Sequence, residues 1–137
     1  MLVATGGCFS FGVHPGHLWI LKKCREFAGS SGKVHVYVNC DEWIKKNKGK
    51  DRLIYNYGER CELLLGTRYV DEVIQFPQDN PSEMIRHYKP ALWVKNCCYE
   101  EMPEQKVVES YGGGVVVLKS PIELSTTTIL ERIRAWK

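Results

Sequence analysis

The feature that most constrains the fold is an alternation of short apolar runs with segments that carry apolar residues at helical spacing. The runs are rich in Val and most have turn residues on at least one side, which is typical of buried parallel strands. The five candidate strands are LVAT from Leu2, KVHVYVN from Lys33, VDEVIQF from Val70, ALWVK from Ala91 and VVVLK from Val115. Strands that alternate with helices predict an α/β fold with a doubly wound parallel sheet of five strands and helices on both faces.

The segments between the candidate strands are expected to be helical. The first ends at the sequence GSSG, which is a helix stop signal, and the last begins with the hydroxyl cap of Ser125. The expected helices cover residues 17–28, 41–46, 59–65, 80–88, 104–111 and 125–136. No repeat, linker or low-complexity segment interrupts this order, so residues 1–137 are expected to form a single domain.

The composition excludes several classes of protein. A net charge of +3 is compatible with anionic small molecules but is far below that of a dedicated nucleic-acid binder. No apolar run approaches the roughly 18–20 residues that a membrane-spanning helix needs. The N-terminus lacks the pattern of a signal peptide, so we expect a cytoplasmic protein that binds neither nucleic acid nor membrane.

The cysteines do not form a recognisable metal or redox motif. No CxxC pair occurs, and vicinal Cys97-Cys98 is a poor start for a structural zinc site. A thiol-based redox function is therefore disfavoured. Reduced thiols in core and loop positions are the favoured interpretation of all six: Cys8, Cys24, Cys40, Cys61, Cys97 and Cys98.

The sequence GCFSFGVHPGH, residues 7–17, directly follows the first candidate strand. In open parallel sheets, ligands bind beyond the carboxyl ends of the strands, so this loop lies at the expected site. It contains no GxGxxG, and Val13-His14 stands where a P-loop would have Lys-Ser/Thr. A phosphate site, a metal pair and an incidental turn remain open from the loop alone.

The two histidines of this loop favour phosphate chemistry. Pro15 and Gly16 allow a tight entry into the helix that would place His14 and His17 on the same side. Imidazole N–H donors beside a helix N-terminus suit the charge that develops on a phosphoryl group during transfer. A zinc site would need a third ligand, and the remaining histidines lie in a strand and on a distant helix.

The loop resembles the G-x-F-D-x-x-H-x-G-H signature of the cytidylyltransferase-like nucleotidyltransferases. The resemblance covers nearly the whole chain and is strongest to glycerol-3-phosphate cytidylyltransferases and to the adenylyltransferase domain of ADP-heptose synthases. Further matching segments follow in the family's order: VNCDEW, KGKDR, ERCELLLGTRYVDEVI, KPALWVK, ESYGGGVVVL and STTTILERI. The resemblance also implies a Rossmann-like version of the predicted α/β fold.

The family transfers a nucleoside monophosphate from CTP or ATP to a phosphorylated acceptor and releases pyrophosphate. The resemblance therefore implies a cytidylyltransferase or adenylyltransferase acting on a sugar or polyol phosphate of the glycerol-3-phosphate or heptose-1-phosphate type. Mg²⁺ is the implied cofactor, bound mainly by the nucleotide phosphates and not by protein side chains. A homodimer is a further expectation. The alternative is a catalytically weak homologue that binds a nucleotide or a protein partner.

The resemblance also implies roles for individual residues. His14, His17 and Lys48 are the expected catalytic residues, and Arg52 and Arg60 are expected to contact the acceptor or a phosphate. The expected nucleotide-binding residues are Thr5, Gly7, Cys8, Phe9, Ser10, Gly16, Lys45, Lys95, Ser125, Thr126 and Thr127.

Structural roles are the alternative for several of these residues. The basic run 45–52 also fits a solvated loop, and the hydroxyls that begin the last helix also fit ordinary caps. Arg60 fits a structural ion pair as well as a phosphate contact. Lys95 fits a solvated strand end.

The chain departs from the family's pattern at four places. Ser10 stands where the signature has Asp, and residues 96–99 read Asn-Cys-Cys-Tyr where ADP-heptose synthases have Gly-Gly-Asp-Tyr. Ser120 and Glu123 replace an arginine and a glycine of the cytidylyltransferase pattern. The changes after the fourth and fifth strands fall on the acceptor and base-binding loops, so the sequence leaves both substrates open.

Overall fold

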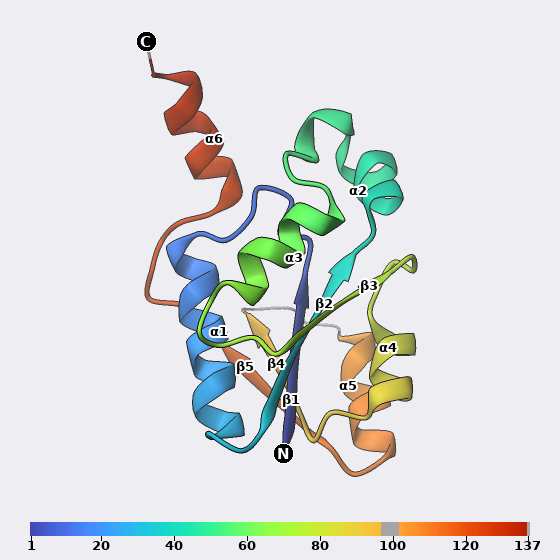
Figure 1. The fold of residues 1–137 in the computed structure, drawn as a ribbon. Coiled ribbons are helices and arrows are strands. Elements are labelled where there is room, and N and C mark those ends of the chain that lie inside the picture. Colours follow the sequence, from blue (N-terminus) through green and yellow to red (C-terminus); the bar gives the residue numbers. More distant parts are fainter. Residues whose placement is uncertain (97–101, 137) are drawn as a thin grey trace.

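A computed structural model, which describes residues 1–96 and 102–136, shows the predicted parallel sheet (Figure 1). The strand order is β3-β2-β1-β4-β5, and every neighbouring pair is parallel. The strands are β1 Leu2–Gly7, β2 Lys33–Asn39, β3 Glu72–Phe76, β4 Leu92–Asn96 and β5 Gly114–Leu118. The helices are α1 Pro15–Ala28, α2 Asp41–Lys48, α3 Tyr57–Leu65, α4 Ser82–Tyr88, α5 Pro103–Ser110 and α6 Thr126–Arg134, with a short 3-10 helix η1 at Lys50–Arg52. The α/β class predicted from the alternating runs is confirmed.

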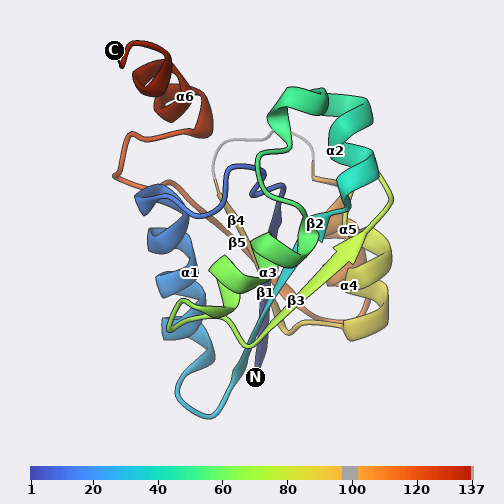
Figure 2. The ribbon, with the colours of Figure 1, turned by 45° about the horizontal axis from the view of Figure 1, so that its top comes forward.

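Helices cover both faces of the sheet, as the alternation predicts. Figure 2 shows α1 and α3 on one side of the sheet and α4 and α5 on the other. Successive residues of one strand serve the two layers: Val3 packs with Ile20 and Cys24 of α1, whereas Ala4 joins the cluster of α4 and α5. This alternation follows from the two-residue period of a strand.

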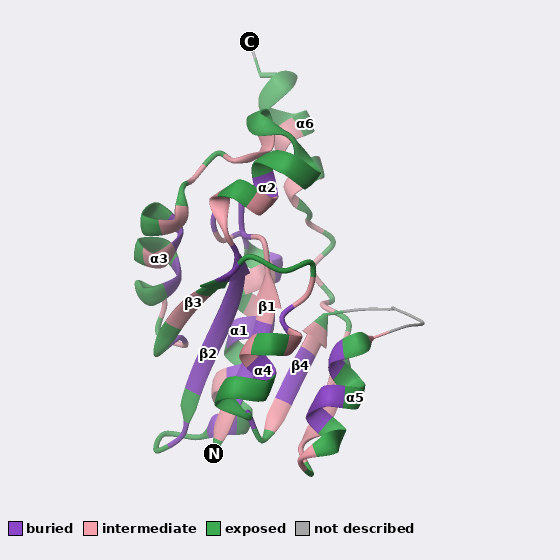
Figure 3. Ribbon diagram, turned by 90° about the vertical axis from the view of Figure 1, so that its right-hand side faces the viewer, coloured by how far each residue is buried: buried purple, intermediate pink, exposed green. Residues whose placement is uncertain are grey.

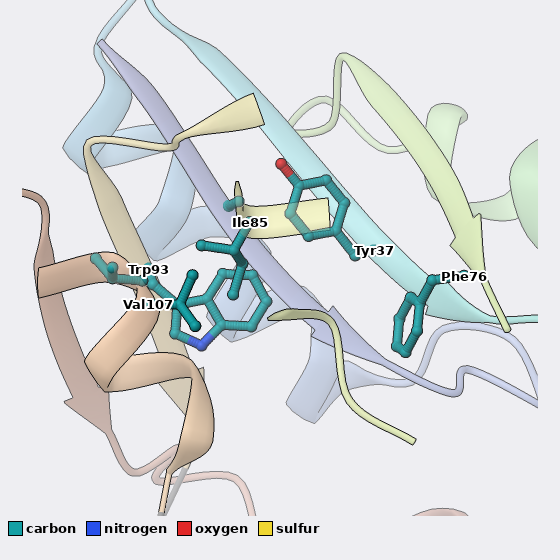
Figure 4. Packing of buried hydrophobic residues seen from close by; sticks show 7 residues of the cluster. Tyr37, Phe76, Ile85, Trp93 and Val107 are labelled. Atoms are coloured by element: carbon teal, nitrogen blue, oxygen red, sulfur yellow. The ribbon is translucent and has the colours of Figure 1, made fainter. Parts of the chain in front are cut away.

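The interior strand β2 is buried along nearly its whole length, which Figure 3 shows in purple. Its Tyr37 is stacked on Trp93 of β4 with ring centroids 5.9 Å apart. Ile85 and Val107 close this cluster from α4 and α5, and Phe76 extends it toward the strand ends (Figure 4). A chain of this length can bury such a core on both faces of its sheet without disulfides.

Two helices begin earlier than the apolar pattern predicts, because caps and not apolar residues set their starts. Helix α1 begins at Pro15, the tolerated first helical position, and His14 is its N-cap. Helix α3 begins at Tyr57, since Asn56 and Glu59 form a reciprocal capping box.

The strand order reverses between β1 and β4, which makes their carboxyl ends the topological switch point of the sheet. The chain runs from β1 outward to β3 and then returns to β4 on the other side of β1. Helix α2 lies above the strand ends, close to this point (Figure 1). A ligand is therefore expected where β1 and β4 end.

Helix α6 stands off from the sheet in all three overall views (Figures 1, 2 and 3). None of its described residues is buried, and the side chains of Ile133 and Trp136 are exposed. The homodimer and the cytoplasmic location remain predictions. No helix within the described ranges is both long and apolar enough to cross a membrane.

Candidate functional site

The two histidines of the glycine-rich loop form one unit at the start of α1. The His14 Nδ1 atom accepts hydrogen bonds from the backbone N–H groups of Gly16 at 3.0 Å and of His17 at 3.4 Å. The His17 Nδ1 atom accepts in turn from the backbone N–H of His14 at 3.3 Å. The two rings are stacked with centroids 3.7 Å apart. This reciprocal capping box places both imidazoles on the same side of the helix start, as the Pro-Gly spacing predicts.

The hydrogen bonds fix the chemical state of both rings. Because each Nδ1 accepts a hydrogen bond, each neutral ring carries its proton on Nε2. Burial and, to a smaller extent, the neighbouring His14 together lower the pKa of His17 to about 3. Burial also lowers the pKa of His14. At neutral pH the turn therefore presents two Nε2–H donors without a fixed positive charge.

The residues before the turn hold it rigidly. Phe9 has a left-handed backbone with φ of 53°, which is uncommon for a bulky residue and marks a constrained position. Its ring lies 4.6 Å from that of His17 and is buried. Gly12 closes the turn by donating its N–H to the Phe9 carbonyl oxygen at 2.8 Å. Phe9, which is predicted to contribute to nucleotide binding, therefore also packs against the ring of His17.

Gly16 lies against Leu124, in the segment that leads into α6. A Cβ atom at this position would come within 2.9 Å of Cε1 of His14 and 3.4 Å of the carbonyl oxygen of Leu124. Leu124 immediately precedes Ser125, the N-cap of α6, whose Oγ accepts from the N–H of Thr128 at 3.1 Å. The start of α6, with Thr126 and Thr127, is thereby brought next to the histidine turn.

Three polar residues of β1 and of the loop after it form hydrogen bonds with other segments of the fold. The Thr5 hydroxyl donates to the Val94 carbonyl oxygen at 2.7 Å and joins β1 to β4 at the switch point. The Cys8 thiol donates to Asn39 Oδ1 at 3.1 Å. Ser10 is buried, and its carbonyl oxygen accepts from Tyr55 N–H at 2.9 Å. Gly7, the last residue of β1, stays partly exposed beside them.

Part of the basic run folds back onto this loop. Burial raises the pKa of Cys8, and the positive charges of Lys48, Arg60 and Arg52 act against that rise. These three cations therefore lie close to the loop. Lys45 is instead half-exposed on α2, where it lies 3.9 Å from Glu42. Of the lysines predicted to bind phosphate, the structure brings Lys48 to the glycine loop and leaves Lys45 on the helix surface.

Arg60 is fully buried and forms the structural ion pair that the sequence offered as one alternative. Its guanidinium donates to the carbonyl oxygens of Cys8 and Asn39, both at 2.8 Å, and to Asp41 Oδ1 at 2.6 Å. It thereby joins the ends of β1 and β2 to the start of α2. These contacts position the loop after β1. The predicted contact of Arg60 with the acceptor or a phosphate stays a prediction.

Lys95 lies at the end of β4, as predicted, and its ammonium group is 3.4 Å from Glu104 Oε1. Glu104 is buried in the first turn of α5 and was not among the predicted site residues. The burial of a glutamate depends on tertiary packing, so no local pattern identifies it. The departures at Cys97 and Cys98 lie outside the described residues.

A cavity of about 130 Å³ opens at the switch point, on the side of the sheet covered by α4 and α5. Most of the residues that line this cavity were not predicted from the sequence. Two of them carry a usable signal: Asn39 directly follows the apolar part of β2, and Asp79 lies just beyond β3. A polar side chain at the carboxyl end of a parallel strand is typical of a binding site. Its lining residues are Gly6, Gly7, Asn39, Trp43, Phe76, Asp79, Asn80, Pro81, Trp93, Lys95 and Glu104.

A rigid turn with two imidazole donors, several nearby cations and a helix N-terminus defines an α/β domain built to handle phosphate groups. In the described residues, no three His, Cys, Asp or Glu side chains gather as a metal cluster.

The chain is similar in sequence to a protein family and to several known proteins. The cytidylyltransferase-like family model matches residues 4–132. The chain is 36% identical over 138 residues to the bifunctional protein HldE of Haemophilus influenzae and, at the same level, to HldE of Actinobacillus pleuropneumoniae. Each alignment covers 99% of this chain but only 28% of the relative. The chain thus spans little more than a quarter of the length of these curated relatives.

Solved structures share the fold. The lipopolysaccharide core biosynthesis protein of Thermoplasma volcanium superimposes with a TM-score of 0.66 at 21% identity, over 88% of this chain and 95% of that one. A protein of unknown function from Archaeoglobus fulgidus gives a TM-score of 0.58 at 17% identity, over 88% and 99% of the two chains. The resemblance of the fold to Rossmann-like domains is therefore confirmed.

The chain belongs to the cytidylyltransferase-like family. The family that the histidine signature predicts is therefore confirmed.

Proposed function

We propose that this nucleotidyltransferase transfers CMP or AMP from CTP or ATP to a phosphorylated sugar or polyol of the glycerol-3-phosphate or heptose-1-phosphate type. An oxygen of the acceptor phosphate attacks the α-phosphorus of the nucleotide. The bond from this phosphorus to the oxygen that bridges to the β-phosphorus breaks, and pyrophosphate leaves with the bonding electrons. The acceptor is already a nucleophile, so no covalent enzyme intermediate is needed.

The observation that carries this proposal is the pair of neutral, Nε2-protonated imidazoles at the start of α1. Negative charge builds up on the α-phosphate oxygens as the acceptor approaches. Two N–H donors held by reciprocal capping bonds are positioned before the reaction and need no reorganisation to stabilise that charge. A neutral imidazole donates a hydrogen bond without binding the ground-state triphosphate as tightly as a cation would, which favours the transition state.

The remaining residues supply the orientation of the triphosphate. The N-terminus of α6, with Ser125 next to the histidine turn, offers hydroxyls and N–H groups for the β- and γ-phosphates. The charges of Lys48 and Arg52 act on Cys8 of the loop and add positive potential there. Mg²⁺, carried mainly by the phosphates themselves, would supply further charge neutralisation on the leaving pyrophosphate.

A catalytically weak homologue is the second candidate, and Ser10 is the observation that favours it. The position that carries Asp in the family signature is a buried serine here, so the loop offers no carboxylate at this point. Such a protein would bind a nucleoside triphosphate without turning it over.

Pyrophosphate release with Mg²⁺ across CTP, ATP, GTP and UTP, each paired with sugar, polyol and choline phosphates, tests the proposal. We expect release with CTP or ATP and at least one sugar or polyol phosphate. Nucleotide binding by calorimetry without release from any pair would establish the weak homologue. The absence of both binding and release would refute the enzymatic function.

A further inference from the structure

Strand β5 forms one edge of the sheet, and in the part of the chain that the structure describes it pairs with β4 alone. None of its five residues is buried, whereas each of the other four strands contains buried residues. Val117 is 51% exposed. An accessible, apolar strand at the edge of a sheet is a template for pairing with a strand of another chain.

The backbone of β5 presents hydrogen-bonding groups along this edge. Gly114 donates its N–H to the carbonyl oxygen of Ala91 at 2.9 Å, so its backbone groups face β4. The N–H and C=O groups of successive strand residues point alternately to the two edges of the strand, so Val116 also faces β4, whereas Val115 and Val117 face outward. No other described segment takes up these outward groups. Two N–H and two C=O groups are therefore free to pair with another strand.

Charged residues protect the opposite edge of the sheet but not β5. The edge strand β3 begins with the exposed Glu72, and the exposed Asp71 immediately precedes it. Like charges that face each other across two strands destabilise their pairing. Strand β5 contains neither a charged residue nor a proline. Because natural sheet edges commonly carry charges or prolines that prevent pairing, the uncharged edge of β5 favours association.

The sequence GVVVL of β5 is self-complementary when it lies antiparallel to a second copy. A two-fold axis at Val116 sets this residue against its own copy and sets Val115 against Val117 of the second copy. Residues 115 and 117 then form the hydrogen-bonded pairs and residue 116 the non-hydrogen-bonded pair, as an antiparallel ladder requires. The outward backbone groups of both copies are all used, and branched side chains meet across the strands. Lys119 lies opposite Gly113 in this register, so the two ammonium groups are not paired.

We propose that two copies of this chain associate through their β5 strands, antiparallel about a two-fold axis at Val116, and form one continuous sheet. The interface is isologous, because the same strand serves both copies. The homodimer that the family resemblance implies then has its contact at this edge. The inference goes beyond the proposed function and does not depend on it, since none of the predicted site residues lies in β5. A contact of two short strands is small, so we expect a dissociation constant in the micromolar range.

Sedimentation equilibrium of the whole chain, from roughly 1 to 500 µM, measures this association. Val117→Lys places a charge in the middle of the paired edge and should raise the dissociation constant about tenfold or more. The matched control is Leu65→Lys, which changes an apolar residue of similar exposure, 48%, at the end of α3 and should leave the constant unchanged. Both variants should still unfold cooperatively in urea, because both side chains are exposed.

Disulfide cross-linking tests the register. The two-fold axis places the Cα atoms of the two copies of residue 116 about 4.5 Å apart, within the range that a disulfide spans. Val116→Cys should therefore form a covalent dimer under mild oxidation. In Val115→Cys the new thiol lies opposite Val117 of the other copy, so its cross-linking should not exceed that of the wild type, whose native thiols set the background.

A monomer throughout the concentration range would overturn the proposal. A dimer that Leu65→Lys weakens and Val117→Lys does not would also overturn it, because the interface would then lie on α3. Equal cross-linking of Val115→Cys and Val116→Cys would contradict the two-fold register. The cross-linking decides the proposal even where Val117→Lys fails to fold.

Discussion

His14 and His17 cap each other: the Nδ1 atom of each ring accepts the backbone N–H of the other residue. The same atoms thus start helix α1 and leave both Nε2–H groups as the donors of the site. The effect of the cap on stability and the effect of the donor on activity can therefore be tested separately. Nδ1 accepts the capping bonds, whereas Nε2–H is the group that would donate to the ligand.

Substitutions of His14 test this separation. Asparagine places an oxygen near the position of Nδ1 and is a good N-cap, so His14→Asn should retain the free energy of unfolding. His14→Ala should lower it by about 1 kcal/mol, the usual cost of a lost N-cap. Both variants should lose roughly 10²–10³ in kcat, since both lack the Nε2–H donor. Urea unfolding and pyrophosphate release measure the two effects. Equal stability losses in the two variants would show that the capping bond contributes little.

The depressed pKa of His17 predicts a pH-dependent contribution to stability. Its folded-state pKa of about 3 lies below the ordinary value of 6.5, so between these values the unfolded chain binds the proton more readily. The contribution is therefore complete above about pH 6.5 and is lost as the pH falls toward 3. On acidification from pH 7 to pH 4, the unfolding free energy of the wild type should fall more steeply than that of His17→Asn, which keeps the cap acceptor but has no imidazole to protonate. Parallel pH profiles would contradict the burial of a neutral imidazole.

Arg60 should matter for stability more than any exposed arginine. Arg60→Met removes a fully buried guanidinium from Asp41 and two carbonyl oxygens. We expect a loss of roughly 3 kcal/mol, the lower end of the range for a broken buried ion pair, since Asp41 retains some access to water. The matched control is Arg68→Met, which changes an exposed arginine just beyond the same helix. Similar unfolding midpoints for the two variants would rule out the positioning role.

Lys48 and Lys46 lie on the same exposed helix, but only Lys48 is among the cations that act on Cys8. Lys48→Gln should raise KM for the nucleotide about ten- to a hundredfold, which corresponds to one charge-assisted hydrogen bond. Lys46→Gln should leave this constant close to that of the wild type. Steady-state kinetics at fixed ionic strength make the comparison, and equal effects would indicate that the basic run attracts nucleotide only through its overall charge.

The sequence was sufficient for the sheet and for the histidine turn because both depend on local patterns. The Val-rich runs identify the strands, and the Pro15-Gly16 pair between the histidines is enough to place them on one side. The role of Arg60 required the structure, since its acceptors lie 21 and 52 residues away in the chain. Trp43 and Asp79 are likewise 36 residues apart, and no short-range pattern reports that their side chains meet.

Helix α6 illustrates the same distinction. Its hydroxyl cap was predicted from STTT, and Ser125 does cap the helix. Leu124, which precedes this cap, lies against Gly16. This contact depends on the path of residues 119–124 from β5 to α6, which the sequence pattern does not specify. A side chain at position 16 would therefore meet His14, as the Pro-Gly spacing indicates, and also Leu124, which the spacing does not indicate.

The most direct test of the central claim is the rate of pyrophosphate release by His17→Asn under saturating nucleotide and acceptor. This variant keeps an acceptor for the His14 N–H and removes the Nε2–H donor. We expect kcat to fall roughly 10²–10³-fold with little change in the unfolding free energy. His87→Asn, which changes an exposed histidine on α4, should retain the wild-type rate. A His17→Asn rate within a factor of about two of the wild type would contradict the claim that the imidazole pair stabilises the transferring phosphoryl group.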